Sequence, residues 1–265
     1  MVPGVIEQIF ETLLALTLGM ARIYPCLFLV PIFAFKELKG MLRHAIVLAL
    51  ALVPMPGIEY ALTGVEHSWI WLVGLIFKEV VIGILLGLLL AMPFWLFESV
   101  GALFDNQRGA LVGGQLNPAL GQDVTPLGHM LKQVFTLLLI IGLGYGVITQ
   151  VIWDSYLLWP PTLWLPQPTV DGFDVYLGLL ADTFSHMVLY AAPLVGLLLM
   201  IDFTVAILSL YSQHLQVSSL SMPAKCLVGI GFVLLYMPML EYLADGRLLL
   251  FRDMPHILPL LLSAP

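Results

Sequence analysis

The sequence has little charge and few cysteines. Lysine, arginine, aspartate and glutamate together make up 10% of its 265 residues, whereas a soluble domain carries about 25%. The ten Lys and Arg residues form no basic cluster, which argues against a nucleic-acid partner. The two cysteines, Cys26 and Cys226, sit in apolar surroundings and give no information about the compartment.

The sequence also lacks the short motifs of common enzymes. It contains no HExxH, GxSxG or Walker A pattern, and no Cys or His cluster at metal-ligand spacing. The central glycines are not followed by the Lys-Ser/Thr of a phosphate-binding loop, and Gln107 and Arg108 have no nucleophile and base beside them. We therefore expect no catalytic site, no metal and no cofactor.

What the chain does contain is long apolar runs. Hydrophobic residues make up 60% of it and the mean hydropathy is +1.01, so we expect an all-α integral membrane protein. The apolar segments lie at 13–30, 45–56, 69–97, 131–153, 175–210 and 226–242. Their lengths fit a bilayer badly, because 12 residues are too few for a ~30 Å hydrocarbon core and 29 helical residues would reach ~43 Å. This pattern predicts helical hairpins of irregular length.

A glycine-rich polar stretch, Asp105 to Asp123, joins two of these segments. Its glycines and prolines disfavour a continuous helix, and its interleaved leucines make a solvated linker a poor description. We expect irregular backbone packed inside protein or lining a cavity; an ordinary extramembrane loop is the alternative. The candidate loop residues are Asp105, Asn106, Gln107, Arg108, Gly109, Gly113, Gly114, Gln115, Asn117, Pro118 and Gly121.

Charged residues inside the apolar segments are the second group of candidates, because such charges are costly in a membrane. They are Arg22, Lys78, Glu79, Asp182, His186 and Asp202. Arg22 either faces protein or water, or snorkels to the surface. Asp182 and His186 share a helix face, so they are either a proton relay or a hydrogen-bonded structural pair, and the pair is favoured.

Small residues within the apolar segments indicate close helix packing. Gly83 and Gly87 fall on one face of their segment. Gly142 and Gly146 flank a Gly-Tyr pair that faintly resembles a potassium filter, but a filter needs four symmetric loops. Close packing is the better interpretation.

The distribution of basic residues predicts the orientation. The connections marked by Lys36 to Arg43, by Arg108 and Lys132, and by Lys225 would be cytoplasmic, whereas those at 57–68 and 154–174 have no Lys or Arg. This implies six crossings and an outside N-terminus. Two further arginines fall on the wrong side: Arg247 and Arg252.

Four local patterns carry a resemblance to a known family. They are Arg22-Ile-Tyr-Pro25 leading to Pro31, Glu79-Val-Val-Ile-Gly83-Ile-Leu-Leu-Gly87, the pair Pro93 and Trp95, and Gly101-Ala-Leu-Phe-Asp105-Asn-Gln107-Arg-Gly109. With these patterns the chain resembles the T component of the type III secretion export gate, the SpaR/YscT/FliR-like family. The Asp-Asn-Gln-Arg-Gly-Ala run is more similar to injectisome than to flagellar members.

The resemblance implies a multi-pass subunit of the Gram-negative bacterial inner membrane, assembled with R-like and S-like gate subunits. The U-like switch protein, the V-like export gate, secreted unfolded proteins and membrane lipid are further implied partners. Residues 1–174 would be an R-like part containing the loop region 98–130, and 175–265 an S-like helical hairpin. Loop 106–122 would help to plug the protein-conducting channel.

Two other functions stay open at this point. One is a secondary transporter that uses Arg22, Asp182, His186 and Asp202 as a charged pathway. Inverted internal repeats would favour it, and we detect none. The other is a purely structural assembly subunit, in which the central loop only fills space.

Overall fold

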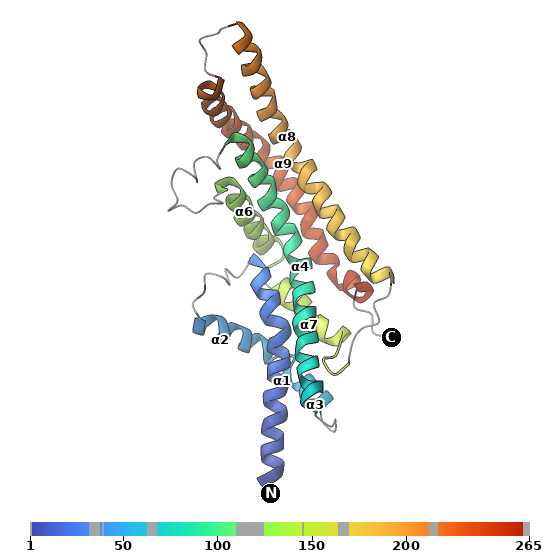
Figure 1. Ribbon diagram of the computed structural model, residues 1–265. Helices are drawn as coiled ribbons and strands as arrows, with labels where there is room; N and C mark the ends of the chain where they lie inside the picture. Colours follow the sequence, from blue (N-terminus) through green and yellow to red (C-terminus); the bar gives the residue numbers. More distant parts are fainter. Residues whose placement is uncertain are drawn as a thin grey trace. The chain divides into compact units, whose positions relative to one another are not determined.

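A computed structural model describes residues 2–31, 38, 40–62, 68–109, 125–144, 146–163, 170–211 and 217–261. These residues form helices and turns and contain no strand, which confirms the all-α prediction. The helices are α1 (Val2–Leu29), α2 (Gly40–Ala51), α3 (Met55–Leu62), α4 (Trp69–Arg108), α6 (Pro126–Gly142), α7 (Gly146–Leu158), α8 (Val170–Tyr211) and α9 (Val217–Leu261) (Figure 1).

Four described helices are long and apolar enough to cross a membrane: α1, α4, α8 and α9. Two bent helix pairs would raise the number of crossings to six. Helices α4, α8 and α9 have 40, 42 and 45 residues. At ~1.5 Å per residue each is about 60 Å long, twice the hydrocarbon core, so at ordinary tilts part of each projects beyond it.

The short segment predicted at 45–56 is the end of α2 and the start of α3, which meet at 64°. Pro54 explains the bend, because the residue before a proline is disfavoured in the helical conformation. A helix begins again directly after the bend, because the Ile58 amide donates to the Pro54 carbonyl at 3.2 Å. The two short helices thus replace one spanning helix.

The apolar segment predicted at 131–153 is not one continuous helix. Helix α6 ends at Gly142 and α7 begins at Gly146, with 78° between them. Gly144 has a φ of +79°, in the left-handed region that L residues with a side chain rarely adopt. Apolar residues continue on both sides of this break, so the apolar run alone does not reveal it.

The last predicted segment, 226–242, is much longer than expected. Helix α9 continues to Leu261 and includes Arg247 and Arg252, which the orientation argument had placed in a tail. Lys132 and Lys225 also lie within helices, so they are poor markers of a cytoplasmic connection. The outside N-terminus therefore remains a prediction.

The chain divides into two compact units: Met1–Met92, Leu143–Leu179 and Leu249–Pro265 form unit 1, and Pro93–Gly142 and Leu180–Leu248 form unit 2. The long helices α4, α8 and α9 each contribute residues to both.

Unit 1 is built around α1, which packs against α2 and α3 and runs beside the first half of α4 (Figure 1). Two aromatic residues of helix α7 donate hydrogen bonds to this group. The Tyr156 hydroxyl donates to the Gly19 carbonyl at 2.6 Å, and the Trp153 indole donates to the Leu50 carbonyl at 3.3 Å. Both donors thus find partners where water would be excluded.

Unit 2 packs the second half of α4 against α6 and against the paired helices α8 and α9 (Figure 1). Its core is aromatic: the Phe135 ring stacks on Phe97, with centroids 4.8 Å apart, and meets Phe94 edge to face at 5.1 Å. Phe104 fills the space beside Gly229 of α9, where an added Cβ would lie 2.8 Å from the ring. These contacts hold α4 in place at the point where the central loop begins.

Candidate functional site

Only the first residues of the predicted loop region lie within the described ranges, and we call them the base of the loop. Residues Asp105 to Gly109 belong to the end of α4 and its closing turn. The other predicted loop residues lie outside the described ranges: Gly113, Gly114, Gln115, Asn117, Pro118 and Gly121. The candidate site that can be built residue by residue is therefore the base of the loop.

Asp105 joins the two ends of the loop. It is fully buried, and its Oδ2 accepts a hydrogen bond of 2.7 Å from the Leu127 amide in the first turn of α6. Amide groups in that turn have no partner within their own helix, and a negative charge there also complements the helix dipole. Arg108 Nη2 lies 2.8 Å from the other carboxylate oxygen and balances the charge. A carboxylate from α4 thus caps α6.

Close backbone contact reinforces this connection. An added Cβ at Gly101 would lie 2.5 Å from the Gly128 Cα, and one at Gly128 would lie 2.7 Å from the Glu98 carbonyl oxygen. Only glycine allows α4 and α6 to approach this closely. Lys132 of α6 forms an ion pair of 2.6 Å with Glu98. The helices on either side of the loop are therefore tightly joined at its base.

Helix α9 holds the end of α4 from another side. The Lys225 ammonium donates to the Gln107 carbonyl at 3.1 Å, in the last turn of α4, and pairs with Asp202 of α8 at 2.6 Å. A cation at a helix C-terminus is favourable because the last carbonyls lack partners there. Gly109 follows with a φ of +93°, and its amide donates to the Asn106 carbonyl at 3.1 Å. Sequence reasoning identified Asp202 but not its partner Lys225.

Arg22 and Glu79 form a fully buried ion pair in unit 1. The guanidinium makes two bonds to the carboxylate, of 2.7 and 3.1 Å, a bidentate geometry that Arg favours. It also donates to the carbonyls of Ser155 and Trp159 at 2.7 and 3.0 Å, and it lies 4.1 Å from the centroid of the Tyr156 ring. Of the two alternatives for Arg22, burial in protein is correct and snorkelling is wrong.

Lys78 completes this cluster. Its ammonium lies 2.9 Å from Glu79 and donates to the carbonyls of Pro161 and Leu163 at 2.6 and 2.7 Å. Two cations thus share one anion, and backbone carbonyls after α7 supply the remaining acceptors. The cluster binds α1, α4 and α7 together, although two residues bonded to each other in it are up to 137 positions apart.

The predicted packing glycines differ in their surroundings. An added Cβ at Gly83 would collide with the Arg22 carbonyl, and one at Gly87 would lie 2.9 Å from the Cys26 Cα. Gly142 has ordinary contact with Leu248 at 3.4 Å, whereas Gly146 has no described atom within 4 Å. Close approach is therefore seen on the α1–α4 face, and for Gly146 it remains a prediction.

Asp182 and His186 lie together on α8, with the imidazole Nδ1 3.0 Å from the Asp182 carboxylate. Arg247 of α9 pairs with the same carboxylate at 2.5 Å and also donates to the Tyr190 hydroxyl at 3.3 Å. Sequence reasoning missed Arg247 because it was assigned to the tail. The arrangement is a cross-helix ionic contact, half exposed on the Asp182 side.

Groups that could hold a metal ion were sought over the same described ranges. No three His, Cys, Asp or Glu side chains come together there. The charged groups described above, from Arg22 and Glu79 to Asp182 and Arg247, instead bond to one another and to backbone, so their observed role is to join helices.

These features define a class before any comparison: a multi-pass helical membrane protein whose internal charges are paired and whose central loop leaves from an anchored base. The sequence pattern of the bacterial export proteins, family 1, matches residues 13–249. The chain belongs to this family. The match confirms the resemblance to SpaR/YscT/FliR-like proteins of type III secretion.

Individual relatives cover most of the chain. The Yop proteins translocation protein T of Yersinia pestis is 29% identical over 96% of this chain and 98% of its own. The surface presentation of antigens protein SpaR of Salmonella typhimurium is 26% identical over 86% and 85%. The flagellar biosynthetic protein FliR of Bacillus subtilis is 22% identical over 86% and 87%. The chain is thus similar to both secretion and flagellar proteins along nearly its whole length.

Proposed function

We propose that this protein is a non-enzymatic subunit of the inner-membrane export gate of a type III secretion system. It forms part of the protein-conducting channel, and loop 106–122 helps to plug that channel. An injectisome is favoured over a flagellar system, since the Yop translocation protein T shares 29% identity with the chain and the Bacillus subtilis FliR 22%.

The anchored loop base is the observation that carries the plug proposal. Asp105 joins the end of α4 to the start of α6, and Lys225 holds the same end of α4. A loop that must obstruct a lumen needs fixed ends, because a drifting base would let the obstruction shift. An ordinary connecting loop does not require a buried carboxylate and two facing glycines beneath it.

The surfaces of α8 and α9 support a multi-subunit assembly. Only 22% and 17% of their most apolar windows are buried within the chain, although both helices are about twice as long as a bilayer core. R-like and S-like subunits would cover these surfaces, with the U-like switch protein, the V-like export gate and unfolded secreted proteins as further partners. The division at 174/175 into an R-like part and an S-like hairpin belongs to this proposal.

The paired charges weigh against a secondary transporter. Arg22, Asp182 and Asp202 each have a counter-charge within the chain, at Glu79, Arg247 and Lys225. A transport pathway needs groups that can exchange partners with a substrate or ion. A purely structural role remains the second candidate, because these same pairs stabilise helix contacts.

The experiment that tests gate membership is purification of the tagged chain from cells carrying the whole secretion system. We expect R-like and S-like subunits to co-purify in a defined complex, and secretion to stop when the chain is deleted and to resume when it is restored. A stable monomer that transports a small substrate after reconstitution alone would contradict the proposal and favour the transporter.

A further inference from the structure

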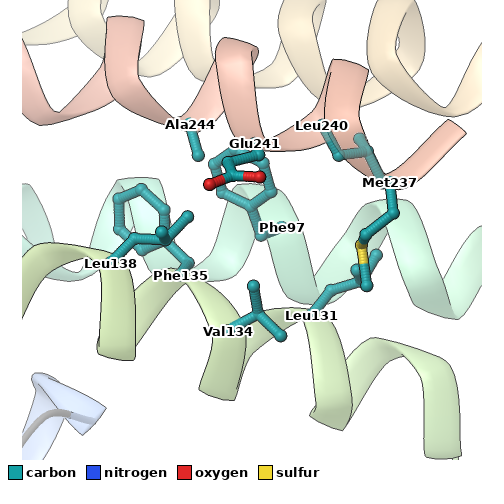
Figure 2. Close-up of a pocket in the computed structure, with 9 residues that line it drawn as sticks. All are labelled: Phe97, Leu131, Val134, Phe135, Leu138, Met237, Leu240, Glu241 and Ala244. Atoms are coloured by element: carbon teal, nitrogen blue, oxygen red, sulfur yellow. The ribbon is translucent and has the colours of Figure 1, made fainter.

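A pocket opens on the surface of unit 2 between α4, α6 and α9 (Figure 2). Its volume is about 170 Å³, close to the ~150 Å³ cavity that accepts one benzene molecule. Phe97 and Phe135 form its floor and are almost completely buried. The pocket is therefore preformed, and its size suits one long or aromatic side chain.

Among the described residues that line this pocket, Glu241 is the single charged one. Figure 2 shows Glu241 and Ala244 on the side of α9 that faces the pocket. The side chain is exposed, and no hydrogen bond or ion pair connects it to any other described residue. Asp182 and Asp202, the carboxylates that join the same two helices, both have a basic partner. Within the described residues Glu241 has no such partner, and neither do Asp245 and Asp253, the other carboxylates of α9; of these three, Glu241 is the one that lines the pocket.

An unpaired carboxylate in an apolar helix is costly whether lipid or protein covers it. Exposed apolar side chains lie on the same helices as the pocket: Leu137 and Ile141 of α6 and Tyr242 of α9 are all more than half exposed. Exposed apolar surface around a preformed pocket is typical of an interaction site. Charge complementarity then requires a cation on the group that covers it.

We propose that the pocket receives a Lys or Arg side chain from an apolar helix of another membrane subunit. The aliphatic stem of that side chain fills the apolar cavity, and its charged end pairs with Glu241. Lys and Arg suit this environment because they combine an apolar stem with a cationic tip. The inference rests on the proposed function, since it names the contact through which a neighbouring gate subunit binds.

The central loop of this chain is a poorer occupant. Its undescribed residues 110–124 contain no Lys or Arg, so they offer no charge to Glu241. A cross-linking experiment separates the occupants: a photo-reactive phenylalanine analogue replaces Leu138, on the pocket wall, in the assembled complex. We expect a cross-linked peptide from another subunit with a Lys or Arg within about one helical turn. Attachment only to segment 110–124, to a second copy of this chain or to lipid would overturn the proposal.

Charge exchange provides the second arm of the test. Glu241→Lys should lower recovery of the cross-linked subunit about tenfold, because like charges would then face each other. Changing the partner's basic residue to Glu should restore recovery. Asp253→Asn serves as a control, since Asp253 is an exposed carboxylate of the same helix that does not line the pocket, and recovery should not change. Unaltered recovery with Glu241→Lys, in a preparation where the unmodified chain assembles normally, would overturn this inference alone. An unmodified chain that binds no other subunit would instead contradict the proposed function.

Discussion

Helix α4 and the α8–α9 pair differ in how much of their apolar surface is buried within the chain. In α4, 67% of the most apolar window is buried within the chain, against 22% in α8 and 17% in α9. The charges differ in the same sense: Arg22 and Glu79 are completely buried, whereas the Asp182 side chain is 44% exposed. The Arg22–Glu79 contact between α1 and α4 is thus satisfied within one chain, whereas the outer faces of α8 and α9 are left for lipid or other subunits to cover. Changes in the first region should affect folding, and changes in the second should affect assembly.

The largest effect is expected from Glu79→Gln. This change leaves Arg22 and Lys78 buried without an anion, and breaking a buried ion pair costs about 3–5 kcal/mol. We expect the detergent-solubilised protein to unfold at a markedly lower temperature, or to be recovered in low yield. Glu59→Gln is the matched control in the same unit, because Glu59 only accepts a bond from the Thr12 hydroxyl at 2.7 Å and its loss should cost about 1 kcal/mol. Equal melting temperatures for the two variants would contradict the assigned role of the cluster.

Gly83→Ala should have the next largest effect. The new methyl group would collide with the Arg22 carbonyl, and overpacking of this kind costs about 1–3 kcal/mol. Gly178→Ala on α8 is the control, because no described atom outside its own stretch of helix lies within 4 Å of the added Cβ. There the higher helix propensity of alanine should stabilise the protein by up to about 1 kcal/mol. Thermal unfolding of both variants checks whether Gly83→Ala lowers the unfolding temperature and Gly178→Ala raises it.

Asp105→Ala should loosen the base of the loop at a smaller cost. It removes the cap of α6 and the partner of Arg108, and loss of a helix cap costs about 0.5–2 kcal/mol. Amide hydrogen exchange should become faster in the first turn of α6. Asn106→Ala changes the neighbouring exposed residue and should leave that exchange unchanged. If both variants exchange at the unmodified rate, Asp105 does not anchor the loop.

The smallest effects are expected at the half-exposed contact of α8 and α9. Asp182→Asn and His186→Gln should each lower the yield of assembled complex modestly, since exposed ion pairs contribute about 0–1 kcal/mol. Secretion per assembled complex should not change if the residues only join helices. A fall in secretion at constant complex abundance would instead indicate a proton relay. Quantifying complex and secreted protein in the same cells separates the two outcomes.

The elements that could be predicted from the sequence were those with a local signal. Long apolar runs located α4 and α8. The polar stretch was wrong as irregular backbone at Asp105 to Arg108, which belong to α4, and its residues 110–123 lie outside the described ranges. The bend at Gly144 was missed because apolar residues continue on both sides of it. Arg247 was assigned to a tail because the last apolar segment was taken to end at Tyr242, yet α9 continues to Leu261.

Partners across the chain had no local signal at all. The sequence places Arg22 and Glu79 in separate apolar segments, and only the fold brings them within 2.7 Å. Lys225 likewise looked like a cytoplasmic marker until packing placed it beside Gln107 and Asp202. The family resemblance identified the Asp105–Gly109 signature, but the capping of α6 by Asp105 depends on how two helices meet.

The central claim, that the loop on this anchored base obstructs a channel, is tested most directly by ion conductance. The measurement compares bilayers containing the purified gate complex with bilayers containing a complex in which Ala110 to Leu116 are deleted. The deletion keeps Asp105 to Gly109, so the observed bonds at the base can still form. We expect both complexes to contain the same subunits, the unmodified complex to be closed, and the deletion complex to conduct ions. A fully assembled deletion complex with the conductance of the unmodified gate would contradict the account.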